Sequence, residues 1–249
     1  MQYGICHLSI IPLRNEPLHT SELCSQVLYG EHFKVLEKRK YWSKIRLAYD
    51  NFEGWLDNTQ YTIIDQLTYQ KIHKQQPKLS GDLVEFIYND NHSLLPVTLG
   101  SNINALSYLS GNFDGQTLEG KQPKTNIVSC ALNYINAPFL WGGKTPFGID
   151  SSGLTQMVYK LNGYSLLRTA SQQSTQGEAL SFIEESEAGD LAFFDDDLGN
   201  IVHVGIMMPD NYIIHAYGKV RIDRIDHTGI FNTDTRSHSH KLRVIKKII

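Results

Sequence analysis

Cysteine is scarce in this chain, because only Cys6, Cys24 and Cys130 occur among its 249 residues. An odd number at irregular spacing fits neither a disulfide framework nor a metal site, so we expect buried free thiols. Long apolar runs are also missing, since none approaches the roughly 20 residues that a membrane-spanning helix needs. The first residues lack the basic segment followed by an apolar one that marks a signal peptide. These absences predict a cytoplasmic protein with no membrane partner.

Charge of one sign does not dominate either. Lys and Arg number 23 against 26 Asp and Glu, which gives a formal net charge of −3. The sequence therefore offers no electrostatic reason to expect nucleic acid as a partner. What the chain does have is apolar content, because 41% hydrophobic residues in 249 are enough for a core and suggest more than one domain.

Residues 1–62 are predicted to form short strands separated by turn residues such as Pro12, Gly30 and Asp50-Asn51. This pattern is typical of a small all-β barrel, with strands expected at 5–11, 27–29, 32–37, 42–47 and 54–56. Residues 63–121 repeat the pattern weakly, at 81–88 and 95–101, and predict a second, degenerate barrel. A short linker is expected around 120–123.

Residues 122–249 combine helical and strand patterns. Spaced apolar residues predict one helix within 125–134 and a second one that begins near Ser151 and stops at Gly163. An acidic loop is expected at 182–187, and strands at 191–194, 201–207, 212–217, 220–225 and 242–248. The sequence therefore predicts an α+β domain in which a helix packs on an antiparallel sheet of five or six strands.

The segment Gly-Ile-Asp-Ser-Ser-Gly at 148–153 is the most informative part of the sequence. It places Ser151 where a turn opens into a helix. The first backbone N–H groups of a helix are unpaired, and the helix dipole favours negative charge there. A thiolate nucleophile benefits from such a position, but this chain holds a serine.

His203 and His215 are expected to meet on one face of a hairpin. If the chain turns at residue 209, position 203 faces position 215, and directly opposed Cβ atoms lie about 4.5–5.5 Å apart. One imidazole can then act as a base while the other orients it. The two alternatives are a pair of structural histidines and half of a metal site. The metal site lacks a third ligand, because His238 and His240 are expected in a solvated segment. The catalytic interpretation is favoured, and no metal is expected.

At this point a family resemblance is evident. The segment from Phe139 to Leu154, Phe-Leu-Trp-Gly-Gly-Lys-Thr-Pro-Phe-Gly-Ile-Asp-Ser-Ser-Gly-Leu, resembles the core motif of the NlpC/P60 cysteine peptidases. Further matches follow in family order at 168–173, 189–194, 203–206 and 215–216. The resemblance implies a papain-like domain at 122–249, with position 151 as the nucleophile, His203 as its base and His215 as the residue that orients His203. Ser151 stands where the family has its catalytic cysteine.

The N-terminal half resembles a bacterial SH3 (SH3b) domain, which the family places before the peptidase domain. The resemblance implies domains at 1–62 (SH3b), 63–121 (a second, degenerate SH3b-like domain) and 122–249 (peptidase). It implies hydrolysis of the γ-D-glutamyl bond to L-Lys or meso-diaminopimelate in murein peptides with a free N-terminal L-Ala, without a cofactor. The absence of a signal peptide favours a role in recycling small wall fragments. The substrate contacts that the resemblance implies are Glu22, Phe52, Trp141, Gly142, Asp150, Ser152 and Thr169.

Several of these assignments carry alternatives. Asp150 also suits the N-cap of the following helix. Phe52 stands where the family usually has a tyrosine, and Thr169 where close relatives have an aspartate. Ser151 has three explanations: an engineered Cys→Ser change, which we favour, a natural muropeptide-binding pseudoenzyme, or a true serine peptidase. An exported peptidoglycan hydrolase is the alternative to a recycling enzyme.

Overall fold

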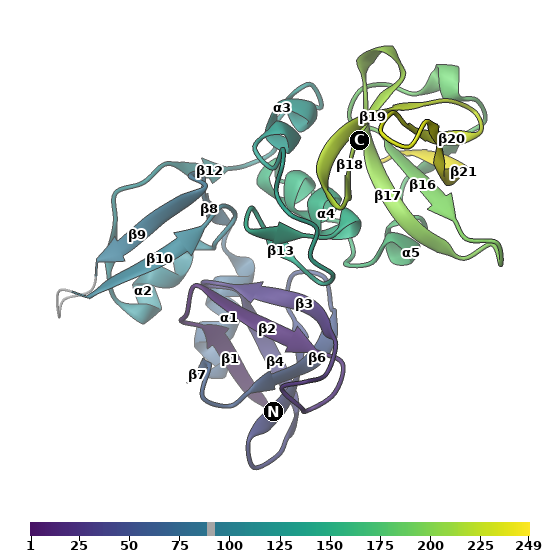
Figure 1. Cartoon of the computed structure of the whole chain (residues 1–249). Coiled ribbons are helices and arrows are strands. Elements are labelled where there is room, and N and C mark those ends of the chain that lie inside the picture. The colour runs from purple at the N-terminus through teal and green to yellow at the C-terminus, as the bar shows by residue number, and fades with distance from the viewer. Residues whose placement is uncertain (89–92) are drawn as a thin grey trace. The chain divides into compact units, whose positions relative to one another are not determined.

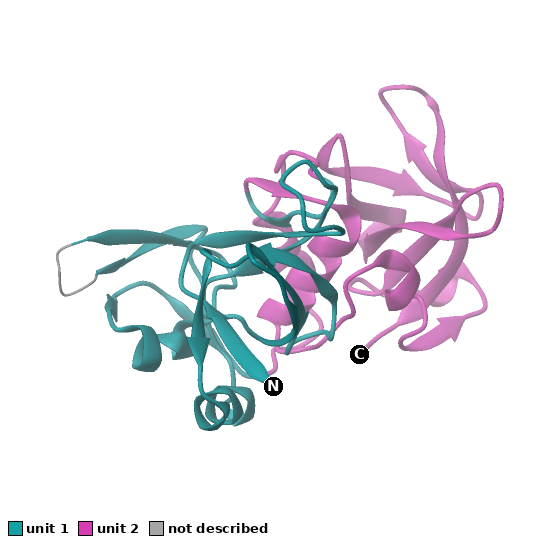
Figure 2. Ribbon diagram, turned by 90° about the horizontal axis from the view of Figure 1, so that it is seen from below, with its two compact units in different colours: residues 1–120, 141–146 teal, residues 121–140, 147–249 magenta. Residues whose placement is uncertain are grey.

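The computed structural model describes residues 1–88 and 93–249. The chain divides into two compact units, which Figure 2 colours separately: unit 1 holds residues 1–120 and 141–146, and unit 2 holds residues 121–140 and 147–249. The three domain ranges expected from the sequence stay predictions. Within the described part of the chain, no helix is both long and apolar enough to cross a membrane.

Unit 1 begins with a seven-stranded antiparallel sheet in the order β3-β2-β6-β5-β4-β1-β7 (Figure 1). Its strands are β1 (Gln2–Cys6), β2 (Ile10–Arg14), β3 (Leu23–Leu28), β4 (His32–Lys38), β5 (Trp42–Leu47), β6 (Glu53–Asp57) and β7 (Tyr61–Ile64). The prediction of one strand over 5–11 is wrong. Cys6 pairs with Tyr61 on β7 whereas Ile10 pairs with Leu28 on β3, so the chain turns between these residues.

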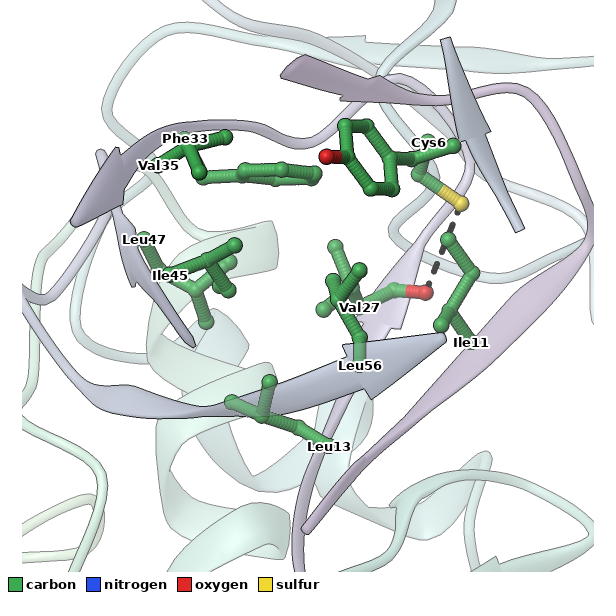
Figure 3. Packing of buried hydrophobic residues seen from close by; sticks show 10 residues of the cluster. Cys6, Ile11, Leu13, Val27, Phe33, Val35, Ile45, Leu47 and Leu56 are labelled. Carbon is green, nitrogen blue, oxygen red and sulfur yellow. Dashed lines mark hydrogen bonds between the residues drawn. The ribbon is translucent and has the colours of Figure 1, made fainter. Parts of the chain in front are cut away.

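The core of this sheet is apolar. Figure 3 shows side chains of β1 to β6 directed into one interior, among them Phe33, Ile45 and Leu56, each with no exposed surface. Burial of each such side chain contributes roughly 1.5–3 kcal/mol to the free energy of folding. The small-barrel pattern in the sequence reflects this alternation of inward apolar and outward polar residues.

The rest of unit 1 contains helix α1 (Gln66–Lys74), which the sequence did not reveal. The chain then forms β8 (Lys78–Ser80), β9 (Val84–Tyr88), β10 (Leu94–Thr98), η1 (Ile103–Ala105), α2 (Leu106–Leu109), β11 (Asn112–Phe113), β12 (Thr117–Glu119) and, later in the chain, β13 (Lys144–Thr145). Its described strands pair as β10-β9-β11 and β12-β8, and its core includes Ile5 of β1 and Tyr29, which follows β3. A second SH3b-like domain here stays a prediction.

Unit 2 is the predicted α+β arrangement. Its elements are α3 (Asn126–Leu132), β14 (Gly148–Ile149), α4 (Ser151–Leu161), α5 (Ala170–Gln173), β15 (Glu178–Leu180), η2 (Ile183–Glu185), β16 (Leu191–Asp195), β17 (Ile201–Met208), η3 (Pro209–Asn211), β18 (Tyr212–Tyr217), β19 (Lys219–Ile225), β20 (Gly229–Asn232) and β21 (Ser237–Lys247). The sheet has seven strands, in the order β15-β21-β16-β17-β18-β19-β20, rather than five or six.

The sheet of unit 2 closes on itself. Because β20 also pairs with β21, the strands from β16 to β21 form a ring whose interior holds Phe194, Met207 and Ile213. Helix α4 packs against β17 and β18, and α3 packs against α4 (Figure 1). This packing places α4, which begins at Ser151, against the two strands that carry the histidines.

Candidate active site

Ser151 is the first residue of α4, as the sequence predicts. Asp150 has extended backbone angles and caps the helix, because its Oδ1 accepts a hydrogen bond from the Gly153 amide at 2.6 Å. Ser151 is only 6% exposed, so its hydroxyl lies in a largely water-excluded environment at the positive end of the helix dipole. This position would stabilise an anion on residue 151 or on a group bound to it.

A buried ion pair holds this helix start. The Arg168 guanidinium, 1% exposed, donates to both oxygens of Asp150, from Nη2 to Oδ2 at 2.7 Å and from Nη1 to Oδ1 at 3.0 Å. Arg168 Nη1 also donates to Ser152 Oγ at 2.9 Å. The N-cap alternative for Asp150 is therefore observed, and its carboxylate is engaged inside the protein. Substrate contacts by Asp150 and Ser152 stay predictions.

Helix α5 is hydrogen-bonded to the first turns of α4. Thr169 caps α5 and forms a capping box with Gln172. Gln173 accepts from Thr155 Oγ1 at 2.7 Å and donates to the Ser152 carbonyl at 2.9 Å. Thr169 thus has a structural role, and its predicted substrate contact remains untested.

His203 and His215 meet as predicted, but by a different register. Gly205, not His203, pairs with His215, because the turn is centred on Asp210, which has a positive φ of 60°. A shift of two residues preserves the face, and diagonal neighbours remain within reach of long side chains. His203 Nε2 and His215 Nδ1 lie 2.9 Å apart.

The sequence analysis missed a carboxylate behind the two histidines. Asp223 on β19, buried, lies with Oδ2 at 3.0 Å from His215 Nε2. Arg221 donates to the same carboxylate from Nε at 2.6 Å and from Nη2 at 2.9 Å. Although burial acts in the opposite direction, hydrogen bonds from His215 and Arg221 hold the pKa of Asp223 below its ordinary value. Asp223 is therefore an ionised acceptor at neutral pH.

An ionised Asp223 fixes the proton positions along this chain of groups. His215 must donate from Nε2 to Asp223, which leaves its Nδ1 as an acceptor in the neutral ring. His203 then donates from Nε2 to His215, and its own Nδ1 carries the lone pair. Burial, together with the charges of His215 and His240, holds the pKa of His203 well below its ordinary value. Burial likewise lowers the pKa of His215. His203 is therefore a neutral imidazole with Nδ1 available as a base.

A third imidazole joins the pair, which corrects the expectation of a solvated segment. His240 on β21 is half-buried and stacks on His203, with ring centroids 4.0 Å apart and planes at 22°. One nitrogen from each of His203, His215 and His240 lies within 4.8 Å of the others. His238 does lie at the surface, where it contacts Asp226 at 3.0 Å.

The remaining predicted contacts lie in unit 1. Glu22 is exposed and accepts from Asn15 Nδ2 at 2.7 Å, while Phe52 is half-buried and packs on the first core. Trp141 is 58% exposed, a surface position that leaves its indole accessible. Gly142 has a φ of 76°, and a Cβ there would approach the Leu23 carbonyl oxygen to 2.5 Å, so this position requires glycine. Their roles in substrate binding stay predictions.

Two family profiles match parts of this chain. The NlpC/P60 family profile matches residues 136–238, and that of the bacterial dipeptidyl-peptidase SH3 domain matches residues 13–60. Dipeptidyl-peptidase 6 of Lysinibacillus sphaericus is 28% identical over 232 residues, which cover 81% of this chain and 82% of that protein. The gamma-D-glutamyl-L-lysine dipeptidyl-peptidase of Bacillus subtilis (strain 168) is 25% identical over 217 residues, covering 77% and 71%.

The fold has a counterpart among solved structures. The crystal structure of an NlpC/P60 family protein from Bacillus cereus ATCC 10987 superposes with a TM-score of 0.80 at 18% identity, covering 99% of each chain. This likeness extends through both units and therefore confirms the fold class expected from the sequence. The chain carries an NlpC/P60 domain at residues 136–238 and, ahead of it, a bacterial SH3 domain at residues 13–60.

Proposed function

We propose that the activity built into this fold is hydrolysis of the γ-D-glutamyl bond to L-Lys or meso-diaminopimelate in cell-wall peptides with a free N-terminal L-Ala. Relatives aligned over most of the chain are named for dipeptidyl-peptidase activity, two of them for the γ-D-glutamyl-L-lysine bond. A role in recycling small wall fragments stays a prediction. With serine at position 151, the chain itself turns over very slowly or not at all.

The observation that carries this proposal is the proton arrangement from Asp223 through His215 to His203. It leaves His203 Nδ1 as the acceptor for the proton of the nucleophile at residue 151, at the start of the helix that packs against the strand of His203. The nucleophile attacks the scissile carbonyl carbon, and backbone N–H groups at the start of α4 suit the resulting oxyanion. The proton on His203 then passes to the leaving amine, and water hydrolyses the acyl intermediate.

Serine weakens this chemistry at its first step. A thiol has a pKa of roughly 8.5, which neighbouring groups readily lower, whereas a hydroxyl must lose its proton during the attack. A site shaped for sulfur also holds the smaller oxygen away from the carbonyl, and a misplacement of about 1 Å can cost on the order of 10²-fold in rate. The other parts of the site are in place. Asp150 caps α4, and hydrogen bonds join His203 to His215 and His215 to Asp223.

The first test is restoration of the thiol. We expect Ser151→Cys to release L-Ala-γ-D-Glu from L-Ala-γ-D-Glu-L-Lys or its diaminopimelate counterpart, detected by chromatography of the products. Ser152→Cys, one residue along the same helix, is the matched control and should stay inactive, as should Ser151→Cys combined with His203→Ala. A folded Ser151→Cys protein that cleaves neither peptide contradicts the proposal.

The second candidate is a binding protein without turnover, and serine at position 151 is the observation that favours it. It predicts that the chain binds the peptide tightly and that Ser151→Cys adds no cleavage. Calorimetry on the serine form, followed by the cleavage assay on the cysteine form, separates the two candidates.

A further inference from the structure

His240 is not used by the mechanism above, yet it completes a group of three imidazoles. The sequence pattern offers no third metal ligand beside His203 and His215, but the fold supplies one from β21. We propose that His203, His215 and His240 form a binding site for Zn²⁺, in which each imidazole contributes one nitrogen and the remaining position is left to water. Three histidines with an open position are a known ligand set for this ion.

The geometry requires only local adjustment. Ligand nitrogens on tetrahedral Zn²⁺, at 2.0–2.1 Å from the ion, lie about 3.4 Å from one another. The facing nitrogens of His203 and His215 are 2.9 Å apart, and the whole set falls within 4.8 Å. His240 is half-buried and its ring stacks on that of His203, so this ring must change its orientation for the third nitrogen to reach the ion.

Zinc binding leaves the number of protons on the three rings unchanged. When Zn²⁺ takes the place between His203 Nε2 and His215 Nδ1, the proton on His203 Nε2 moves to Nδ1 of the same ring. Asp223 already fixes the opposite nitrogen of His215, as carboxylates do for histidine ligands of metals. His240 Nδ1 lies 2.8 Å from Ser239 Oγ, which orients the third ring in a similar way.

Binding would disable the base. An imidazole that coordinates through Nε2 must carry its proton on Nδ1 while it remains neutral. His203 would then present a donor instead of a lone pair to residue 151. This consequence rests on the proposed function, whereas the site itself does not: zinc binding is measured on the serine form, and peptide cleavage on the cysteine form.

Calorimetry of ZnCl₂ binding to the unaltered chain tests the proposal. We expect one ion per chain, with no net release of protons at neutral pH when buffers of different ionisation enthalpy are compared. Co²⁺ in place of Zn²⁺ should give the visible absorption bands of a tetrahedral site. His240→Gln should weaken binding by roughly tenfold or more, because it removes one of three ligands.

The control is His19→Gln, since the His19 side chain is 77% exposed and remote in sequence from the three ligands. It should leave the affinity unchanged. Should His240→Gln fail to fold, the imidazole ring signals of the unaltered chain decide the matter, because Zn²⁺ must shift those of His203, His215 and His240. Equal affinity in His240→Gln, shifts confined to exposed histidines, or no binding would each overturn the proposal.

Discussion

Asp223 decides which nitrogen of His203 can accept a proton, although it touches neither His203 nor residue 151 in the hydrogen-bond chain. Its carboxylate can only accept, so each imidazole in turn is left with one defined tautomer. Arg221 keeps that carboxylate ionised through two short hydrogen bonds. Asp223 therefore positions the base His203 indirectly, through the two hydrogen bonds that His215 makes.

This dependence predicts the effect of Asp223→Asn in the Ser151→Cys background. The amide can donate to His215 Nε2, which reverses both tautomers and places a proton on His203 Nδ1. We expect kcat to fall at least about 10²-fold with the fold intact, as happens when the aspartate behind a catalytic histidine is made neutral. Asp226→Asn, which alters a surface contact with His238, is the matched control. Equal activity of both variants in the peptide-release assay would remove Asp223 from the mechanism.

At the scale of elements, the start of helix α4 depends on an ion pair that the sequence pattern does not predict. Arg168 was identified only as part of a motif, yet it lies buried against Asp150, and its partner is the N-cap of the helix that carries residue 151. Removal of one member of a buried ion pair leaves the other charge buried without compensation, which destabilises the fold. The start of α4 is therefore sensitive to loss of either one.

Arg168→Met should destabilise the protein strongly, because it leaves the Asp150 carboxylate buried without its cation. We expect the free energy of unfolding, measured by urea denaturation, to fall by about 3–5 kcal/mol. Adding Asp150→Asn to this variant should recover part of that loss, since the uncompensated charge disappears. Arg243→Met, at a side chain 66% exposed, serves as the control. A loss no larger than that of the control would show that the pair contributes little.

A second element-scale prediction concerns β4 and α1. His32 on β4 packs against Tyr69 and His73 of α1, and its Nε2 is buried without a hydrogen-bond partner among the described residues. Burial, with the charge of His73, lowers the pKa of His32 to about 4, while Glu31 acts in the opposite direction. In the unfolded chain a histidine has a pKa of about 6.5.

Because the folded pKa of His32 is the lower one, the unfolded state binds the proton first as pH falls. The contribution of His32 to the free energy of unfolding should be fully present above about pH 6.5 and decline toward about pH 4. The slope from this group is at most about 1.4 kcal/mol per pH unit. Thermal unfolding of His32→Phe across this range should show a shallower decline than the unaltered chain. His7→Phe, at a less buried histidine, is the comparison. Parallel pH profiles of His32→Phe and the unaltered chain would contradict this assignment.

Hairpin arithmetic from the sequence located the face of the two histidines but not their register. The apolar alternation fixes which side a residue lies on, while the centre of the turn depends on backbone angles at Asp210 and Asn211 that residue type only suggests. The same arithmetic around Gly218 pairs His215 with Arg221 and leaves Asp223 on the same face, so this residue could have been found. His240 could not, because β21 is tied to the strands of the site by pairing with β16, which lies far from it in the sequence.

At the scale of the whole molecule, the two units carry different parts of the proposed function. Unit 2 holds the nucleophile position, the base and the residues that orient it. Unit 1 holds the bacterial SH3 domain and the exposed carboxylate of Glu22. The ion pair with Arg168 already engages the charge of Asp150. Recognition of a substrate ammonium by Glu22 stays a prediction from the sequence.

This division predicts how the serine form discriminates between peptides. The free L-Ala ammonium of L-Ala-γ-D-Glu-L-Lys is attracted by a carboxylate, whereas an N-acetyl group removes that attraction and adds bulk. We expect calorimetry to show that the acetylated peptide binds at least about tenfold more weakly, a difference that should shrink in Glu22→Gln. Glu16→Gln, another exposed glutamate of unit 1, should retain it. Similar affinities for both peptides in the unaltered chain would mean that the amine end of the substrate is not recognised, and would favour a hydrolase that acts on peptide stems still joined to the glycan.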